Sequence, residues 1–112
     1  MAKLTLRVDL GPGKAVGPGK IRLLEAIRDS GSISRAGRTL GMSYRRAWML
    51  IDNLNRTFRC AVVTAQPGGK RGGGTRLTPF GAELIARYRA IEQRSQKEAA
   101  CELTALQRAL RR

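Results

Sequence analysis

The sequence contains no histidine and only two cysteines, so it lacks the residue types that most often act as general bases and metal ligands. Cys60 and Cys101 are too few for a disulfide scaffold, and we expect reduced intracellular thiols. The carboxylates Glu25, Asp29 and Asp52 are scattered along the chain without metal-ligating neighbours. We therefore expect no catalytic residues, no metal and no cofactor, and a protein that is not an enzyme.

Long hydrophobic runs are also missing. No segment approaches the roughly 20 apolar residues that cross a bilayer, and the first residues lack the apolar stretch of a signal peptide. We therefore expect a soluble, cytoplasmic protein with no membrane partner. Aromatic residues make up only 4% of the chain, so its core has to be aliphatic. Two Gly-Lys pairs lack the other residues of a phosphate-binding loop, so NTP binding is not expected.

Acidic residues are scarce relative to basic ones. The 22 Lys and Arg residues outweigh 8 Asp and Glu residues, which gives a net charge of +14. A polyanionic partner explains this self-repulsion most simply, because lysine and arginine displace counterions from phosphates. Residues 1–78 hold 15 of the basic and 4 of the acidic residues. The nucleic-acid face is therefore expected in this part of the chain.

The 112 residues suffice for one domain, which opens with a predicted strand and a helix. Residues 4–9 alternate between apolar and polar side chains, and this period predicts a half-buried strand. A loop rich in glycine and proline follows. After this loop, apolar residues recur at helical spacing and predict a helix over residues 18–30, with Pro18 in its first turn and Gly31 after its last turn.

Two further helices are predicted in close succession. A short helix over residues 35–40, with Ser34 as its N-cap, is followed by a longer helix over residues 44–56. Gly41 lies in the three-residue turn between them, where the chain has to reverse through a positive φ. A short helix, a glycine turn and a longer helix form a helix-turn-helix. We place this helix-turn-helix at residues 34–57.

A β-hairpin follows the helix-turn-helix. Residues 61–65 and 75–78 are predicted to be strands, and the segment between them is rich in glycine and contains Lys70 and Arg71. A basic hairpin in this position would act as a wing, over residues 61–78. The predicted fold is thus mainly α with a small β-hairpin wing, that is, a winged helix-turn-helix.

The last segment is predicted to form one long helix, which begins at Pro79 after the N-cap Thr78 and continues to about residue 110. Such a helix extends beyond the domain in residues 1–78, so its apolar stripe needs a partner, and a second copy is the simplest one. Residues 79–112 are therefore expected to be a dimerisation element. The stripe consists of Leu84, Tyr88, Ile91, Leu103, Leu106 and Leu110.

The longer helix of the helix-turn-helix has a core side and an exposed side. Its first turn is expected to enter the major groove of duplex DNA, where arginine binds guanine or phosphate. Ordinary solvated charges are the alternative interpretation of these arginines. The predicted DNA-contacting residues of this helix are Ser43, Tyr44, Arg45, Arg46, Met49 and Asn53.

Other side chains complete the predicted interface. Lys70, Arg71 and Arg76 of the wing are expected to contact the DNA backbone, with solubilising charges as the alternative. Ser34 and Arg35, at the start of the short helix, are included as DNA contacts. For Trp48, packing against the preceding helix or the wing is favoured over contact with a base.

These segments resemble a known family. Residues 31–36 and 41–48, together with the glycine-rich wing and the Leu-Thr-Pro-Phe-Gly sequence after it, resemble the N-terminal DNA-binding domain of the molybdate-responsive ModE regulators. The looser Ser-Ile-Ser-x-Ala pattern is also shared with LysR-type regulators. The resemblance implies a winged-helix dimer on palindromic promoter DNA, formed through the first and last helices, which adds Ile21 and Leu24 to the dimerisation residues.

Full-length ModE regulators carry a C-terminal oxyanion-binding domain, and we expect none in this chain. Control by abundance or by a separate effector-binding partner would then replace direct molybdate sensing. The favoured prediction is a sequence-specific transcription regulator that binds double-stranded DNA as a homodimer. A non-specific architectural or RNA-binding protein, and an adaptor that binds proteins through its last helix, are the alternatives.

Overall fold

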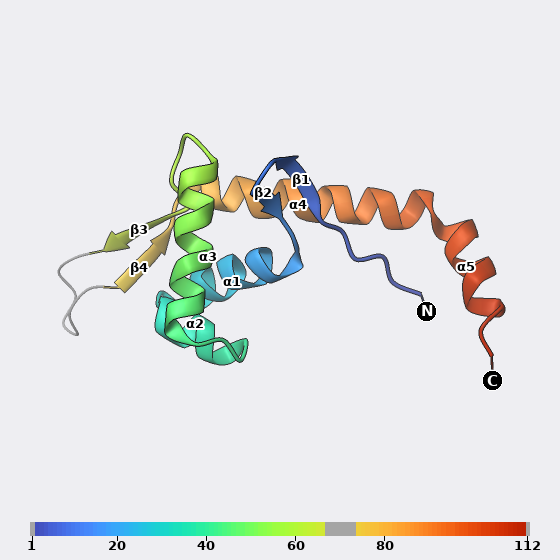
Figure 1. Ribbon diagram of the computed structural model, residues 1–112, viewed down its shortest axis with the longest axis horizontal. Helices are drawn as coiled ribbons and strands as arrows, with labels where there is room; N and C mark the ends of the chain where they lie inside the picture. Colours follow the sequence, from blue (N-terminus) through green and yellow to red (C-terminus); the bar gives the residue numbers. More distant parts are fainter. Residues whose placement is uncertain (1, 67–73, 112) are drawn as a thin grey trace.

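The computed structural model describes residues 2–66 and 74–111. Figure 1 shows the first three helices next to a two-stranded hairpin, from which α4 extends along the longest dimension of the molecule. The principal extents are 55 × 31 × 22 Å. The mainly α, winged fold is confirmed. The elements are β1 (Val8–Gly11), β2 (Lys14–Val16), α1 (Pro18–Ser30), α2 (Ile33–Thr39), α3 (Tyr44–Thr57), β3 (Val63–Gln66), β4 (Gly74–Leu77), α4 (Pro79–Glu98) and α5 (Ala100–Arg108).

The N-terminal strand differs from the prediction. Val8–Gly11 pairs antiparallel with Lys14–Val16, with Val8 opposite Val16, so part of the segment predicted to be a loop forms a second strand. Gly13, at the tip of this hairpin, has a φ of +70°. The chain therefore reverses at the glycine and proline residues, and both strands of the pair lie later in the sequence than residues 4–7.

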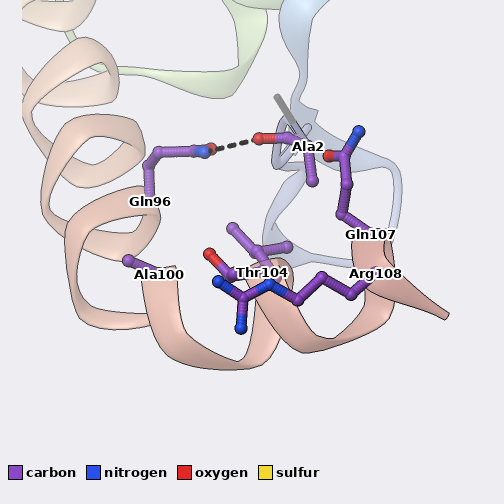
Figure 2. A pocket seen from close by; sticks show the side chains of 7 residues that line it. Ala2, Gln96, Ala100, Thr104, Gln107 and Arg108 are labelled. Carbon is purple, nitrogen blue, oxygen red and sulfur yellow. Dashed lines mark hydrogen bonds between the residues drawn. The ribbon is translucent and has the colours of Figure 1, made fainter.

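Residues 2–7 instead follow α4 in an irregular, extended course. The Gln96 side chain accepts a hydrogen bond from the Leu4 amide at 2.7 Å and donates one to the Ala2 carbonyl oxygen at 2.9 Å, the contact drawn in Figure 2. The Tyr88 hydroxyl donates to the Leu6 carbonyl oxygen at 2.7 Å. Burial raises the pKa of Tyr88. Helix side chains thus satisfy backbone groups that the period-two pattern had assigned to a strand.

Helix α1 matches the prediction at both ends, but α2 begins earlier than predicted. Its N-cap is Ser32, whose Oγ accepts from the Arg35 amide at 3.1 Å, so the assignment of Ser34 as the cap is wrong. Gly31 ends α1 with a φ of +69°, and this reversal leaves Ser32 already extended, which is the conformation that an N-cap needs. The helix can therefore start directly afterwards.

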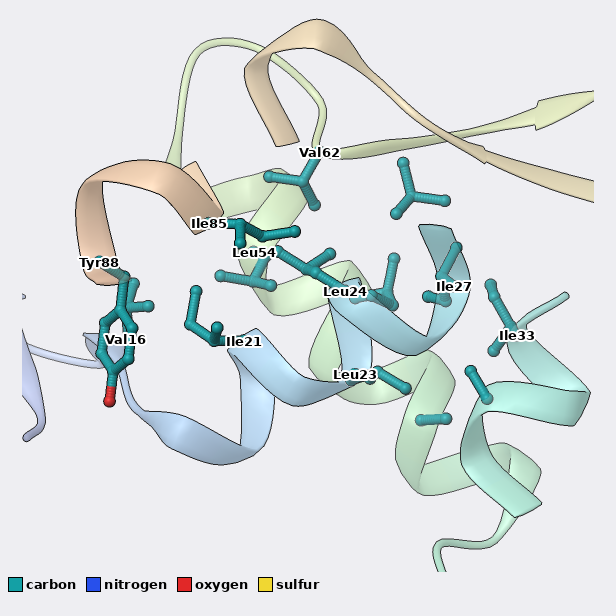
Figure 3. Close-up of a cluster of buried hydrophobic side chains, with 14 residues drawn as sticks. Val16, Ile21, Leu23, Leu24, Ile27, Ile33, Leu54, Val62, Ile85 and Tyr88 are labelled. Carbon is teal, nitrogen blue, oxygen red and sulfur yellow. The ribbon is translucent and has the colours of Figure 1, made fainter. Parts of the chain in front are cut away.

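The core is aliphatic, as predicted. Its buried side chains come from α1, α2, α3, the strands and the first half of α4. Figure 3 shows those of α1 at the centre, between α3 and the start of α4. Tyr88 is its one aromatic member among the described residues. The core consists of Val16, Ile21, Leu23, Leu24, Ile27, Ile33, Ala36, Ala47, Ile51, Leu54, Val62, Val63, Ile85 and Tyr88.

This core corrects three of the expected dimerisation residues. Ile21 and Leu24 have no exposed surface, and Tyr88 is 2% exposed. Their apolar surface is already buried within one chain, so a second copy cannot contact it without unfolding the domain. The apolar face of α1 therefore packs in the core of its own chain. The sequence pattern cannot distinguish a core stripe from an interface stripe, because both have the same spacing.

The predicted single C-terminal helix is broken at Ala99. Helix α4 ends at Glu98, Ala99 leaves the helical conformation with a ψ of 8°, and α5 turns away from the axis of α4 (Figure 1). The bend brings Leu103 of α5 next to Ala2, where both line a groove of about 370 Å³. Contact with the N-terminal segment therefore accompanies the change in direction. No glycine or proline marks this position in the sequence.

None of the helices in residues 2–66 and 74–111 combines the length and the apolar character needed to cross a bilayer.

An ion-pair cluster fastens α4 to α1. The Arg89 guanidinium donates to both carboxylate oxygens of Glu25, at 2.8 and 3.1 Å, and to Glu92 at 2.7 Å. The side chains of Arg89, Glu25 and Glu92 are all partly buried. The hydrogen bonds that Arg89 donates to Glu25 and then to Glu92 raise its pKa above the ordinary value. Bidentate geometry of this kind gives a stronger ion pair than surface charges do.

We expect Arg89→Ala to lower the free energy of unfolding by about 1–3 kcal/mol, because it leaves two partly buried carboxylates without their common partner. Urea denaturation followed by circular dichroism measures this change. Arg87→Ala is the matched control, since Arg87 pairs with Glu83 on the exposed side of the same helix. Its effect should stay below about 0.5 kcal/mol. Equal effects of the two variants would contradict the role assigned to the cluster.

Candidate nucleic-acid interface

The first turn of α3 is exposed, and a serine caps it. The Ser43 Oγ accepts from the Arg46 amide at 3.1 Å, which confirms the predicted N-cap. Tyr44, Arg45 and Arg46 follow directly and are all exposed. Because the helix dipole and the free amides of the first turn attract anions, cations placed here add to a local positive field.

Arg45 and Arg46 are available for an external partner. Within the described part of the chain, neither guanidinium takes part in an ion pair or in a side-chain hydrogen bond. Arg56, about three turns further along α3, is instead paired with Asp52 at 3.1 Å. Charge that one protein group already neutralises attracts phosphate less strongly. The unpaired cations of α3 are thus concentrated at its N-terminal end.

One flank of α3 forms a shallow basic groove with the start of α1. Arg45, Arg46 and Met49 line it, together with Lys20 of α1. Met49 is among the most exposed apolar side chains of the described residues. Five of the predicted contacts of this helix, counting its cap Ser43 and also Asn53, therefore lie on one surface.

Asn53 lines the same groove and also holds α3 against α1. Its Oδ1 accepts a hydrogen bond from the Lys20 ammonium group at 2.7 Å, and the same group donates to the Ala15 carbonyl oxygen at 2.7 Å. Burial, and then the charge of Arg7, lower the pKa of Lys20. The amide oxygen of Asn53 is thus engaged within the protein, where it fixes α3 against α1. Among the described residues its amide nitrogen has no hydrogen-bond partner, so the DNA contact of Asn53 stays a prediction.

The opposite flank of α3 faces the β3–β4 hairpin. Tyr44 and Trp48 lie here, one helical turn apart, in a groove that also includes Ser34 and Thr75. Trp48 lines this groove together with residues of the hairpin and is 44% exposed. The two aromatic rings therefore form a surface distinct from the one that carries Met49.

Asn55 sets the position of the hairpin, and the sequence analysis missed it. Its Oδ1 accepts from the Val62 amide at 2.8 Å, and its Nδ2 donates to the Val63 carbonyl oxygen at 3.5 Å. On the other strand, the Thr75 amide donates to the Gly31 carbonyl oxygen at 3.0 Å. The only sequence signal for this role was the position of an asparagine on the half-buried flank of the helix. These bonds tie β3 to α3 and β4 to the end of α1.

The hairpin carries one predicted contact that the structure describes. Arg76 is exposed and pairs with Thr64 across the ladder, one position from the Ala65–Thr75 pair. Since alternate strand residues point to opposite faces, Arg76 points away from the face that Thr75 occupies. Lys70 and Arg71 lie outside the described residues. Strand β3 begins at Val63, slightly later than predicted, and β4 begins at Gly74, slightly earlier.

The start of α2 lies beside this groove. Arg35 is exposed there, and Ser34 lines the groove itself. The Ser34 hydroxyl accepts a hydrogen bond from Arg38 at 3.4 Å. Ser34 is therefore on the surface that the hairpin and α3 share, and Arg35 follows it in α2. Among the residues described, no group of three or more Cys, Asp or Glu side chains is arranged to hold a metal ion.

Three curated relatives match the chain over this region. The molybdenum transport protein ModE of Azotobacter vinelandii is 42% identical over 82% of this chain. The molybdenum-pterin-binding protein MopB of Rhodobacter capsulatus is 50% identical over 71% of the chain. The DNA-binding transcriptional dual regulator ModE of Escherichia coli K12 is 38% identical over 86% of the chain. The matched regions cover 33%, 30% and 37% of these proteins, respectively, so the chain spans about a third of their length.

A family profile gives the broader assignment. The profile of the bacterial regulatory helix-turn-helix proteins of the lysR family matches residues 19–82, which is more than half of the chain. The match includes α1, the helix-turn-helix, the hairpin and the first residues of α4. The chain therefore belongs to the lysR family of bacterial regulatory helix-turn-helix proteins.

Proposed function

We propose that this protein is a transcription regulator that binds specific sequences of duplex DNA through α3. The observation that carries the proposal is the exposed first turn of α3, where Arg45 and Arg46 have no partner within the described residues. The names of its relatives support a regulatory role connected with molybdenum. A cytoplasmic location follows from such a role in a bacterial cell.

The geometry of α3 suits the major groove. An α-helix with its side chains is about 10–12 Å across, and the major groove of B-DNA is about 12 Å wide. Insertion of the first turn brings Arg45 and Arg46 to base edges or phosphates, and Met49 follows one turn behind. Arg35 of α2 and Arg76 of β4 are exposed as well, and we assign them contacts with phosphates.

Selection from a pool of random duplexes tests the proposal. The purified protein is expected to enrich a common motif, and to bind the selected duplex at least about a thousandfold more tightly than a scrambled one. Fluorescence anisotropy of labelled duplexes measures both affinities. Equal affinities without a motif would indicate an architectural protein instead. Absence of binding to any duplex would favour the protein adaptor.

We also propose that the protein acts as a homodimer through α5 and the end of α4. Leu106 and Leu110 are 68% and 67% exposed, and Ile91 of α4 is exposed as well. Leu103 and Leu106 lie on one side of α5, and Leu110 follows two residues after the helix ends at Arg108. A second copy buries this stripe symmetrically and presents two copies of α3 to a palindrome. The division of the chain at residue 78, and control by a separate effector-binding partner, stay predictions.

Combined substitution of Leu106→Asp and Leu110→Asp is expected to raise the dissociation constant of the dimer by about 100-fold or more, because each buried leucine contributes about 1.5–3 kcal/mol. Analytical ultracentrifugation over a range of concentrations measures this constant. Ala105→Asp is the control, since it adds a charge to an exposed position on the other side of α5. A wild-type protein that remains monomeric would contradict the proposal, and so would a double variant that dimerises normally.

A further inference from the structure

A groove of about 530 Å³ separates α3 from the β3–β4 hairpin. Two large aromatic side chains stand at its α3 wall, with Tyr44 57% and Trp48 44% exposed. An aromatic ring that a fold leaves in water gives up the stabilisation that its burial would provide, and such rings are frequent at binding surfaces. Trp48 is the single tryptophan of the chain.

The chemistry of this groove suits a polyanionic strand. Its lining contains the hydroxyl groups of Ser34 of α2 and Tyr44 of α3, and no charged side chain. Two grooves along the N-terminal segment and α4, in contrast, contain the carboxylates of Glu92 and Glu98, respectively. Serine, threonine and tyrosine hydroxyls are common donors to DNA phosphates. An indole ring adds an apolar face and one N–H donor.

The position of the groove relative to α3 specifies which part of DNA it meets. A helix that fills the major groove has one DNA strand along each flank, because the groove is scarcely wider than the helix. Tyr44 and Trp48 occupy the flank towards the hairpin, whereas Arg46 and Met49 occupy the other face. Any strand that passes between α3 and the hairpin runs over Trp48.

We propose that this groove holds the sugar–phosphate backbone of one DNA strand, with the Trp48 ring packed on a deoxyribose and its Nε1–H donated to a phosphate oxygen. The inference rests on the proposed function and adds a residue to it that was not among the predicted contacts. Trp48 fixes how deeply and at which angle α3 enters the major groove. Its contribution to affinity is independent of base sequence.

The emission of Trp48 tests this directly, because no other tryptophan contributes to the signal. Titration with the selected duplex is expected to shift the emission to shorter wavelength or quench it, with the same midpoint as the anisotropy of a labelled duplex. Binding seen by anisotropy without any change in emission would overturn the inference and leave the proposed function intact. Absence of binding by anisotropy would remove the proposed function, and the inference with it.

Two substitutions extend the test. Trp48→Ala is expected to weaken binding about tenfold for selected and scrambled duplexes alike, which corresponds to about 1.4 kcal/mol. Leu10→Ala is the matched control, because Leu10 is a similarly exposed apolar residue on the β1–β2 hairpin. Its affinity should equal that of the wild type. An unchanged affinity of Trp48→Ala, with an unchanged circular dichroism spectrum, would refute the contact.

Neutral backbone analogues locate the phosphate. A methylphosphonate placed at one position at a time along the selected duplex should weaken wild-type binding at the phosphate that Trp48 contacts. Trp48→Phe keeps an aromatic ring but lacks the N–H donor, so the same analogue should have no further effect on it. A profile that is identical for the wild type and Trp48→Phe would exclude the N–H contact.

Discussion

Simultaneous replacement of Arg45 and Arg46 by alanine is expected to weaken binding to the selected duplex by at least about 100-fold, since each arginine should contribute about 1–3 kcal/mol. Both side chains are exposed, so the free energy of unfolding should change by less than about 0.5 kcal/mol. Fluorescence anisotropy and urea denaturation measure the two quantities on the same preparations. The double variant is thus expected to lose DNA affinity while its free energy of unfolding stays nearly unchanged.

The single variants distinguish the two roles that an arginine can play. An arginine that binds a guanine should relax sequence preference at one position of the motif, with little change in the salt dependence of binding. An arginine that binds a phosphate should weaken all duplexes alike and reduce the salt slope by about one. Affinities of each variant for a panel of single-base changes, at several salt concentrations, assign Arg45 and Arg46 separately.

A matched control accounts for the loss of charge alone. Arg108→Ala with Arg111→Ala removes the same two charges from exposed positions at the C-terminal end, far from α3 (Figure 1). Its affinity should fall by no more than a few-fold, through the reduced long-range attraction. An equal loss in both double variants would mean that α3 has no special part in binding. Retention of regulatory function by the Arg45 and Arg46 variant would favour the protein adaptor.

The helix boundaries were predictable because local signals determine them. Gly31, Ser43 and Thr78 have the backbone conformations that their residue types favour, and each lies where the sequence placed a helix end. The cap of α2 was misassigned because Ser32 and Ser34 are chemically equivalent as caps. Only the backbone conformation after Gly31 distinguishes them, and that conformation depends on how α1 ends.

The errors of the sequence analysis arise from contacts between distant segments. The Leu4 amide and the Leu6 carbonyl oxygen form hydrogen bonds with side chains of α4, which lie more than 80 positions later. The contacts of Asn55 with the start of the β3–β4 hairpin likewise depend on tertiary packing. A helical wheel separates buried from exposed positions, but it does not show which exposed polar groups the protein itself uses.

Gly81→Ala is expected to lower the free energy of unfolding by about 2–3 kcal/mol, although alanine is the better helix former. A Cβ at this position would overlap the carbonyl oxygen of Val62 and lie 2.7 Å from the Leu77 Cδ1. The Val62 carbonyl also accepts the Thr78 amide at 3.0 Å, so it cannot move without loosening the start of α4. The cost of this overlap exceeds the gain in helix propensity, which is about 1 kcal/mol.

The same substitution at Gly19 should change the free energy of unfolding in the opposite direction. Gly19 also lies in the first turn of a helix, but a Cβ there would have no heavy atom within 4 Å. Gly19→Ala is expected to stabilise the protein by about 0.4–1 kcal/mol, because alanine restricts the unfolded chain. Urea denaturation of both variants measures the difference. Since Val62 and Leu77 lie at the base of the β3–β4 hairpin, Gly81→Ala should also weaken DNA binding, whereas Gly19→Ala should not. Stabilisation by both substitutions would contradict the close approach of α4 to the hairpin.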